Sequence, residues 1–517
     1  MNPTPNGALR TTVSRLLPRR LKSGLRRRLL RFLDAVPASA LPPAGAVPTG
    51  PRQVPGPAAA DLVDPALVGA SYTNDEVITF LALENAYLKG QRSAALREAG
   101  RQAWDARAIE DDEDGAHAAE LAAEYVRGQR EDDARERHLV VSNAYPDVGN
   151  EYGNGFVHRR VKHYQSVGAA VDVVIIGPAL EQRIYAYDGV RVLSGKGPEL
   201  GAVLAATEYA GVSVHFLNAQ MWSWLVPALP RLKLHVFLHG YECCHWIRRI
   251  FNIAPARHFD RHIQRTLELQ RFWQDVVAHP HGPANYVFVS EWLRRAASDD
   301  MEVAFPAAKS HVLHNVVDTR LFSYVPKPPE QRFRLLWVRS AANRNYGSDI
   351  AVQCLRELSR SPHWERTSVT VIGDGRYFDE FFDAFGDDPR VDIQRRFASQ
   401  EEIAALHKDH GILLVPTRLD SQGVSRDEGM ASGLVPATNL VAAVPEFVDG
   451  DCAVLAPAED GTALAVGIVG LMDDPGLFQR MSEAAYRRAS AQSGQAASVE
   501  RELELMGMAP SKTGGRT

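Results

Sequence analysis

The chain has 517 residues, of which 45% are hydrophobic and 23% are charged, and its formal net charge is −5 at pH 7. These values are typical of a globular protein of two or three domains, and the mildly acidic balance argues against a general nucleic-acid-binding protein. Four cysteines, two of them adjacent at Cys243 and Cys244, exclude a disulfide framework and favour a reducing compartment. The sequence contains neither a run of 18 apolar residues, which would predict a membrane-spanning helix, nor a signal-peptide pattern. We therefore expect a cytoplasmic protein.

Residues 1–60 separate into a basic amphipathic helix and a linker. From Leu21 onward, apolar residues recur at i, i+4, i+8 and i+11, while most arginines and lysines of residues 10–33 lie off that stripe. Such a helix can rest on an anionic surface such as the inner face of the plasma membrane, and a disordered basic arm is the alternative. Residues 35–60 are rich in Pro, Ala and Gly, which predicts a linker.

Residues 61–137 are predicted to form an accessory helical segment. Its strongest helical patterns are ITFLALENAYL and AAELAAEYV, which the acidic run EDDEDG separates. We interpret the acidic run as a solvated turn. No residue pattern in this segment predicts a chemical role, and we expect it to pack on the main domain.

From His138 onward the pattern predicts an α/β fold. Short runs rich in Val, Ile and Phe, such as HLVVS, VDVVIIG, HVFLHG and YVFVS, alternate with helical segments, which is typical of βαβ units and parallel sheets. The pattern stops at the proline-containing segment 323–332 and starts again with RLLWV. We therefore predict two Rossmann-like units facing a cleft, in residues 138–325 and 326–490, followed by a C-terminal helix and tail in residues 491–517.

Open α/β sheets bind ligands beyond the carboxyl ends of their strands. The residues that follow predicted strands are therefore candidates for a site. They are Asn154, Gly155, His239, Gly240, Glu242, Ser290, Glu291, Arg339, Arg344, Gly373, Asp374, Gly375 and the segment from Asp420 to Glu428.

The segment PTRLDSQGVSRDEGMASGLVP, residues 416–436, belongs to an ordered set of four motifs. The other three are HNVVDTRLF (314–322), LLWVRSAANRNYGSD (335–349) and TVIGDG (370–375). Together they resemble the retaining GT-B glycosyltransferases of family 4, the glycosyl transferases group 1, and among them bacterial surface-polysaccharide transferases. The resemblance covers residues 138–490 and implies an acceptor-binding first unit and a nucleotide-sugar-binding second unit.

The residues of segment 416–436 agree with that implication. GILLVP ends a predicted strand, and Ser425 with Glu428 predicts a capping box that starts a helix ending near Gly433. The amides of Gly423 and Val424 then point outward with the helix dipole behind them, which suits a phosphate. Acids beside a phosphate are better explained as acceptors for hydroxyl groups, so a nucleotide sugar fits this segment. Alternatively, Glu428 only caps the helix and the first acid, Asp420, is an ordinary turn residue.

The resemblance assigns roles residue by residue. Asp420 takes the place of the family's first acid, which is usually Glu, and Arg339 takes the place of the family's arginine. The family's lysine falls at Arg344 or Asn345, and Arg344 then supplies the positive charge. Alternatively, Arg344 is only a surface charge. The implied catalytic residues are His239, Arg339, Arg344 and Asp420, and the implied donor-binding residues are Gly155, Gly373, Gly375, Gln422, Gly423, Val424 and Glu428. A simple turn is the alternative for the loop that contains Gly155.

The resemblance implies front-face substitution without a protein nucleophile and without a required metal or other cofactor. The donor is then UDP-, GDP- or a similar nucleotide sugar, and the acceptor is a glycan or a lipid-linked glycan. His239, His245 and the cysteine pair do not have the spacing of a metal site. A non-catalytic glycan-binding scaffold, or an epimerase or phosphorylase of the same fold, stays as an alternative.

Overall fold

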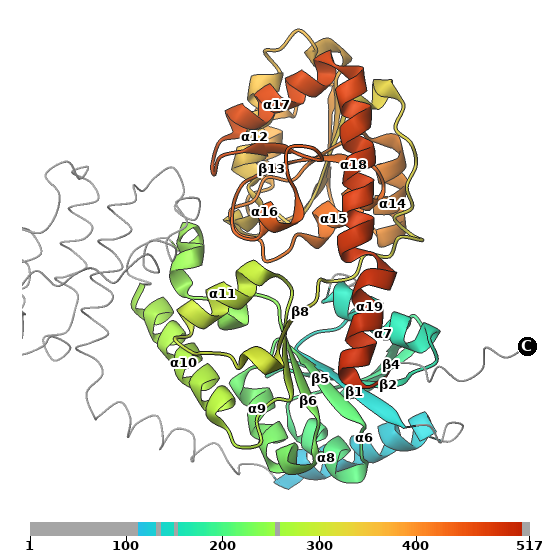
Figure 1. Ribbon diagram of the computed structural model, residues 1–517, viewed down its shortest axis with the longest axis vertical. Coiled ribbons are helices and arrows are strands. Elements are labelled where there is room, and N and C mark those ends of the chain that lie inside the picture. Colours follow the sequence, from blue (N-terminus) through green and yellow to red (C-terminus); the bar gives the residue numbers. More distant parts are fainter. Residues whose placement is uncertain (1–111, 131–135, 149–152, 254–258, 509–517) are drawn as a thin grey trace, which may run out of the picture. The chain divides into compact units, whose positions relative to one another are not determined.

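The computed structural model describes residues 112–130, 136–148, 153–253 and 259–508. The expected basic helix of residues 10–33, the linker and the ITFLALENAYL helix lie outside these ranges. Residues 246–267 belong to a separate compact unit, whose described part gathers around Trp246, Ile250 and Ile263. Both sheets belong to the other unit (Figure 1).

The first sheet has eight strands in the order β3-β4-β2-β1-β5-β6-β7-β8. Neighbours pair in parallel except β3 and β4, which are antiparallel. Helices on both faces explain why β1 and β2 are buried along their whole length and read as continuous apolar runs. The strands are β1 (Arg137–Ser142), β2 (Ala170–Ile176), β3 (Arg183–Tyr187), β4 (Val190–Gly195), β5 (Gly211–His215), β6 (Leu234–Leu238), β7 (Asn285–Phe288) and β8 (Ser310–Val312).

The second sheet has six parallel strands in the order β11-β10-β9-β12-β13-β14. Counted along the chain this is the order 3-2-1-4-5-6 of a dinucleotide-binding fold, in which the direction of winding reverses between β9 and β12. The loops after these two strands therefore border the crevice in which such folds bind ligands. The strands are β9 (Arg334–Val338), β10 (Ser368–Gly373), β11 (Val391–Arg395), β12 (Ile412–Leu414), β13 (Val435–Asn439) and β14 (Val454–Ala456).

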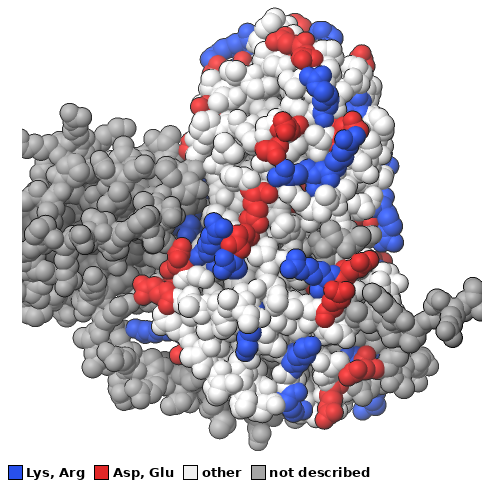
Figure 2. Space-filling view, in the orientation of Figure 1, with Lys and Arg blue, Asp and Glu red and all other residues white. Residues whose placement is uncertain are grey.

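Helices follow most strands, as the sequence predicts. Those of the first half are α6 (Asp112–Arg130), α7 (Gly155–Ser166), α8 (Pro198–Ala206), α9 (Ala219–Leu225), α10 (Phe259–Ala278) and α11 (Glu291–Asp300). Those of the second half are α12 (Ser348–Leu358), α13 (Asp379–Phe385), α14 (Gln400–Asp409), α15 (Val424–Ala431), α16 (Val444–Phe447), α17 (Gly461–Asp473), α18 (Pro475–Ser493) and α19 (Gln495–Met506). On the face shown in Figure 2, basic and acidic side chains lie interspersed.

Helix α6 confirms the helix predicted from AAELAAEYV and its packing on the main domain. Ala122 and Tyr125 are buried in the core of the first sheet. The Tyr125 hydroxyl donates to the Val173 carbonyl (2.9 Å) and accepts from the Val173 amide (2.7 Å), so it is hydrogen-bonded to the backbone of β2. The acidic run was wrongly interpreted as a turn, because α6 starts at Asp112 inside it.

The last helix returns to the first sheet. Val499, Leu503 and Met506 of α19 pack in the same core as Val140 and Phe237, while the preceding helix α18 contributes Phe478 and Met481 to the core of the second sheet (Figure 1). The predicted boundary at residue 491 falls inside α18, which extends to Ser493, and the last described helix, α19, starts at Gln495.

A fully buried ion pair fixes α19. Arg160 Nε lies 3.1 Å from both carboxylate oxygens of Glu502, and Arg160 Nη1 donates to Asn315 Oδ1 (2.7 Å). Tyr164 donates to the same carboxylate. Neither Arg160 nor Glu502 is exposed to solvent. Removing one partner of such a pair leaves an uncompensated charge in the core.

Within the described ranges, no single helix has the length and apolar character needed to cross a membrane. Helices α17 and α18, bent by 111° at their junction, meet that test only when counted together. Leu464, Ile468 and Leu471 of α17 are buried in the core of the second sheet.

We predict that Glu502→Ala lowers the free energy of unfolding by about 3–5 kcal/mol, because Arg160 loses its only carboxylate partner among the described residues. Glu500→Ala changes an exposed acid on the same helix and should alter stability by less than about 0.5 kcal/mol. Urea unfolding of the two variants measures the difference. Equal midpoints would contradict a stabilising role for the buried pair.

Candidate active site

Arg339 and Asp420 meet at the point where the second sheet reverses its winding. Arg339 follows β9 and Asp420 follows β12, and Arg339 Nη2 lies 3.7 Å from Asp420 Oδ2. The guanidinium also donates to the Pro416 carbonyl (2.9 Å) and lies over the Tyr346 ring at 4.5 Å. Burial lowers the pKa of Arg339, and the nearby Asp420 carboxylate opposes that shift. Two residues that are 81 positions apart in the sequence, a cation and an acid, thus lie side by side, as the resemblance implies.

Gly373 and Gly375 allow the loop that carries Arg339 to pack closely against the backbone at the end of β10. A Cβ at Gly373 would overlap the Arg339 carbonyl, and one at Gly375 would overlap the backbone of Ala341 and Ala342. Gly375 also has a φ of +134°, which other residues rarely adopt. The structure therefore explains both glycines by close backbone packing, and their contact with a donor stays a prediction.

Helix α15 begins differently from the sequence prediction. Its N-cap is Gly423, with a φ of +96°, and no side chain among the described residues caps it. The predicted capping box of Ser425 and Glu428 is wrong, because Ser425 already lies inside the helix and Glu428 points to another partner. The predicted end near Gly433 is confirmed by its φ of +87°. A helix start without a side-chain cap leaves the amides around Gly423 and Val424 suited to an anion.

The partner of Glu428 is Arg159 from helix α7. Arg159 Nη2 lies 3.1 Å from Glu428 Oε1, and Arg159 Nη1 donates to Gln400 Oε1 (3.0 Å). Burial raises the pKa of Glu428, Arg159 lowers it, and the neighbouring Asp427 raises it further. The sequence analysis missed Arg159, because α7 and α15 are far apart in the chain. The one feature of the sequence that could have pointed to Arg159 is its position one helical turn after the Asn154–Gly155 loop.

The Gln422 side chain forms its hydrogen bonds within the protein and holds the loop in place. Its Oε1 accepts from the Asn315 amide (2.6 Å), while its Nε2 donates to the Asn315 carbonyl (3.0 Å) and to Asp427 Oδ2 (3.1 Å). These bonds use the side chain's acceptor and donors. The interpretation of the Gln422 side chain as a donor-binding group is therefore corrected.

Arg344 is not a free cation at this site. Its Nη1 lies 2.6 Å from Glu380 Oε1 and 3.6 Å from Asp349 Oδ2, and its guanidinium covers the Tyr377 ring at 3.8 Å. Acids neutralise its charge, so the interpretation of Arg344 as the substitute for the family's lysine is not supported by its contacts. Arg426 in the first turn of α15 was missed, and its charge contributes to the lowered pKa of Arg339. Arg426 is itself paired with Asp427 (2.6 Å).

His239 follows β6 and adjoins the same loop. The Ser421 hydroxyl donates to the His239 carbonyl, which brings the end of β6 beside the residue that follows Asp420. Glu242 accepts from the amides of His239 and Gly240, and burial raises the pKa of Glu242 to about 7 against these hydrogen bonds. His239 is therefore close in space to the Asp420 loop, although 181 residues separate them.

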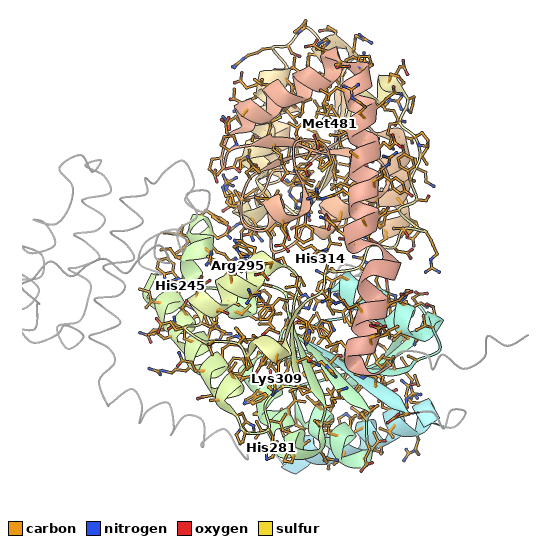
Figure 3. All side chains as sticks on the ribbon, viewed as in Figure 1. His245, His281, Arg295, Lys309, His314 and Met481 are labelled. Carbon is orange, nitrogen blue, oxygen red and sulfur yellow. The ribbon has the colours of Figure 1, made fainter. Side chains whose placement is uncertain are left out.

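The remaining strand-end residues have structural partners. Asn154, with a φ of +54°, donates to Asn143 Oδ1, and a Cβ on the adjacent Gly155 would meet nothing within 4 Å. Ser290 caps α11. Glu446 accepts from the Glu291 and Trp292 amides at the start of the same helix and lies 3.8 Å from His314, labelled in Figure 3. Gly155 as a donor-binding residue stays a prediction.

Among the residues that the structure describes, no three His, Cys, Asp or Glu side chains gather so that they could hold a metal ion. Cys243 is buried, and burial raises its pKa well above the ordinary value. Since a metal binds the thiolate, this environment disfavours Cys243 as a ligand. That the reaction needs no metal stays a prediction.

Comparisons with known proteins agree with this geometry. Residues 332–474 match the family model described as Glycosyl transferases group 1. An MMP alpha-(1->4)-mannosyltransferase from Mycolicibacterium hassiacum is 27% identical over 197 residues, which are 38% of this chain and 47% of that protein. The chain thus matches about half the length of this curated relative.

Solved structures show the same fold at low identity. Sucrose-phosphate synthase from Thermosynechococcus elongatus has a TM-score of 0.53 at 14% identity, over 72% of this chain and 98% of that chain. Anabaena HepE, solved with UDP and glucose, has a TM-score of 0.52 at 13% identity, over 72% and 99%. The chain therefore has the GT-B fold of two parallel α/β domains and carries a glycosyl transferases group 1 domain.

From the contact between Arg159 and Glu428 we predict how the pKa of Glu428 responds to mutation. In Arg159→Gln the pKa of Glu428 should rise further, because the opposing charge is lost while burial remains. The carboxylate then takes up its proton at a higher pH than in the parent. Titration of the glutamate carboxyl carbon signals by NMR measures this, with the Glu428 signal assigned by its loss in Glu428→Gln. Arg159→Lys, which keeps the charge, should titrate close to the parent. An unchanged titration in Arg159→Gln would contradict the pairing.

Proposed function

We propose that the protein is a retaining glycosyltransferase that transfers a sugar from a nucleotide-diphosphate sugar to a glycan or lipid-linked acceptor. The observation that carries the proposal is the pairing of Arg339 and Asp420 at the reversal point of the second sheet, next to a helix start without a side-chain cap. A cation and free amides suit a diphosphate, and carboxylates suit sugar and ribose hydroxyls. The matched family, the mannosyltransferase relative and the nucleotide-sugar complexes of structural neighbours support the same class.

We assign each proposed contact with the nucleotide sugar to a residue of this chain. The α15 amides and Arg339 bind the diphosphate, Asp420 accepts from hydroxyls of the transferred sugar, and Glu428 accepts from the ribose. Arg159 then has to leave Glu428 or share it with the ribose, because the two compete for one carboxylate. We assign His239, whose carbonyl accepts a hydrogen bond from Ser421, to the sugar side of this arrangement.

Retention follows from substitution on one face of the sugar. The bond between the anomeric carbon and the diphosphate oxygen breaks, and the acceptor oxygen bonds to the same face. The departing phosphate oxygen takes the acceptor's proton, so no side chain has to serve as the base. The protein contributes position and stabilisation of the developing diphosphate charge.

A nucleotide-sugar panel tests the proposal. We expect one donor among UDP- and GDP-sugars to raise the melting temperature of the protein, as ligands of the native state do. That donor should be consumed faster with an acceptor than alone, and product NMR should show the anomeric configuration of the donor. Release of free sugar phosphate would indicate a phosphorylase, isomerised donor would indicate an epimerase, and binding without turnover would indicate a scaffold.

We predict that Arg339→Ala lowers turnover about 100-fold or more, as the loss of a transition-state charge partner does. Arg334→Ala is the matched control, because Arg334 is exposed at the opposite end of the same strand β9. Steady-state kinetics with the donor from the panel measure both variants. Turnover in Arg339→Ala equal to that of the control would remove Arg339 from the proposed mechanism.

The same proposal includes attachment to the cytoplasmic face of the membrane through residues 10–33. Their basic residues contribute about 1 kcal/mol each near an anionic surface. A chain without residues 1–34 should turn over a soluble acceptor at the parent rate but sediment less with phosphatidylserine-containing vesicles. Binding of the full chain should weaken with salt, since screening shortens the field to about 8 Å at physiological ionic strength. Equal sedimentation of both chains would exclude the helix as a membrane anchor.

A further inference from the structure

A half-exposed tyrosine lies at the carboxyl edge of the first sheet, beside the loop of Asp420. Tyr241 comes two residues after His239, whose carbonyl accepts from Ser421. A Cβ on the intervening Gly240 would lie 3.5 Å from Ser421 Oγ, so the backbone that leads to Tyr241 adjoins the Asp420 loop directly. Tyr241 is 51% exposed, although aromatic side chains contribute most to stability when they are buried.

Phe216 supports one face of the Tyr241 ring. It directly follows β5, and the two rings stack with their centroids 5.3 Å apart and their planes at 20°. Phe216 is buried and has a φ of +57°. A bulky residue keeps such a backbone conformation only where its neighbours impose it, and such positions gather at functional sites. The tyrosine ring therefore rests on a fixed support, and a ligand would approach its other face.

The hydroxyl of Tyr241 is held from another strand end. Asn143 follows β1, and its Nδ2 donates to Tyr241 Oη (2.7 Å), while its Oδ1 accepts from Asn154 Nδ2 (2.9 Å). Strands β1, β5 and β6 are neighbours in the sheet, so the loops after all three meet at this ring (Figure 1). A hydrogen bond that is open to water contributes little net stability. We therefore interpret these contacts as ones that orient the ring.

An aromatic ring held in this way suits a sugar. One face of a pyranose carries several C–H groups, which pack on an aromatic ring through dispersion and through their attraction to its negatively polarised face. The hydroxyl groups at the edge of the same pyranose need polar partners, and the amide of Asn143 lies at the rim of the ring. This amide is uncharged, so it suits a hydroxyl better than a phosphate, whose strong partners are cations. A ring that is already oriented also loses little freedom when a ligand binds.

We propose that Tyr241 forms an acceptor subsite, in which its ring stacks on the C–H face of the pyranose that receives the transferred sugar. Phe216 and Asn143 are positioning residues, because they hold the ring and need not touch the acceptor. The subsite rests on the proposed function, since it takes the acceptor of that reaction. It makes the reacting hydroxyl that of a pyranose, whether or not a lipid is attached to it.

Binding is measured on the full chain without a donor. The sugar probes are methyl α-mannopyranoside, methyl α-glucopyranoside and methyl β-galactopyranoside, and geranyl phosphate is the lipid probe. Saturation-transfer NMR should show contact with at least one pyranoside, strongest at the C–H protons of one ring face. Tyr241→Ala should raise the Kd of that pyranoside about 10-fold, the effect of one stacking contact. Tyr241→Phe, which keeps the ring, should stay within about 2-fold of the parent.

Kinetics give an independent readout. Tyr241→Ala should raise the acceptor KM about 10-fold and leave the donor KM unchanged, because the ring contacts only the acceptor. Asn143→Ala removes only the hydrogen bond to the ring and should raise the acceptor KM about 2- to 3-fold. The matched control is Tyr486→Ala, because Tyr486 of α18 also stacks on an aromatic ring, that of Tyr324, which lies beside Gly433 after the end of α15. The control should keep both KM values of the parent.

The outcomes separate the subsite from the proposed function. Pyranoside contact that Tyr241→Ala weakens, in a protein that turns over no donor, contradicts the proposed function and leaves a sugar site at Tyr241 standing. Turnover with the parent's acceptor KM in a folded Tyr241→Ala overturns the subsite and leaves the proposed function standing. Contact with geranyl phosphate alone, or with none of the probes, also overturns the subsite. Melting temperatures show whether Tyr241→Ala is folded; if it is not, Tyr241→Leu, which keeps an apolar side chain without a ring, gives the same comparison.

Discussion

The loop of residues 420–423 is hydrogen-bonded from both sides, and the candidate site depends on this constraint. On one side the Gln422 side chain pairs with both backbone groups of Asn315, which lies after β8 of the first sheet. On the other side Ser421 donates to the carbonyl of His239 after β6. A loop with two such anchors cannot move its acid, Asp420, independently of the first sheet. The anchors also explain why Gly423 must turn with a positive φ immediately afterwards, where a Cβ would lie 2.9 Å from Arg426 Nη1.

Buried charge accounts for much of the remaining architecture. Arg160 with Glu502, Arg159 with Glu428, and Arg339 with Asp420 are arginine–carboxylate pairs that are buried or nearly so. The first has close contacts at 3.1 Å and further partners, which fits a structural role. The third is longer, at 3.7 Å, and no hydrogen bond between its two side chains is formed. In such a pair the cost of burying the two charges is only partly offset by their mutual attraction. A ligand with both anionic and hydroxyl groups can offer each charge an additional partner.

The sequence was sufficient for the fold and for part of the site. Parallel strands buried on both faces leave continuous Val- and Ile-rich runs, so both sheets could be predicted from the sequence. Arg339 and Asp420 were candidates because Arg339 directly follows β9 and Asp420 lies in the loop between β12 and α15. Contacts between elements distant in the chain were not: Arg159 meets Glu428 only after two helices from different sheets come together. The Ser425–Glu428 spacing matched a local capping pattern, but tertiary pairing with Arg159 overrode it. Gln422 and Arg344 were assigned from motif position, whereas their partners Asn315 and Glu380 decide what their side chains do.

The pair of Arg159 and Glu428 gives the first sheet a direct influence on a residue of the second. Burial alone would favour the protonated form of Glu428, and Arg159 opposes this. The same arginine that lowers the pKa of the acid also contacts one of its oxygens, at 3.1 Å. A ribose hydroxyl that binds Glu428 therefore either takes the free oxygen Oε2 or displaces Arg159. In the first case the arginine favours the charged form of the carboxylate, which is the stronger acceptor. In the second case an arginine one turn into α7 is released beside the Asn154–Gly155 loop, where a diphosphate provides a new partner. Under the proposed function, either route would make donor binding depend on contact between the two sheets, because Glu428 belongs to one sheet and the arginine that lowers its pKa to the other.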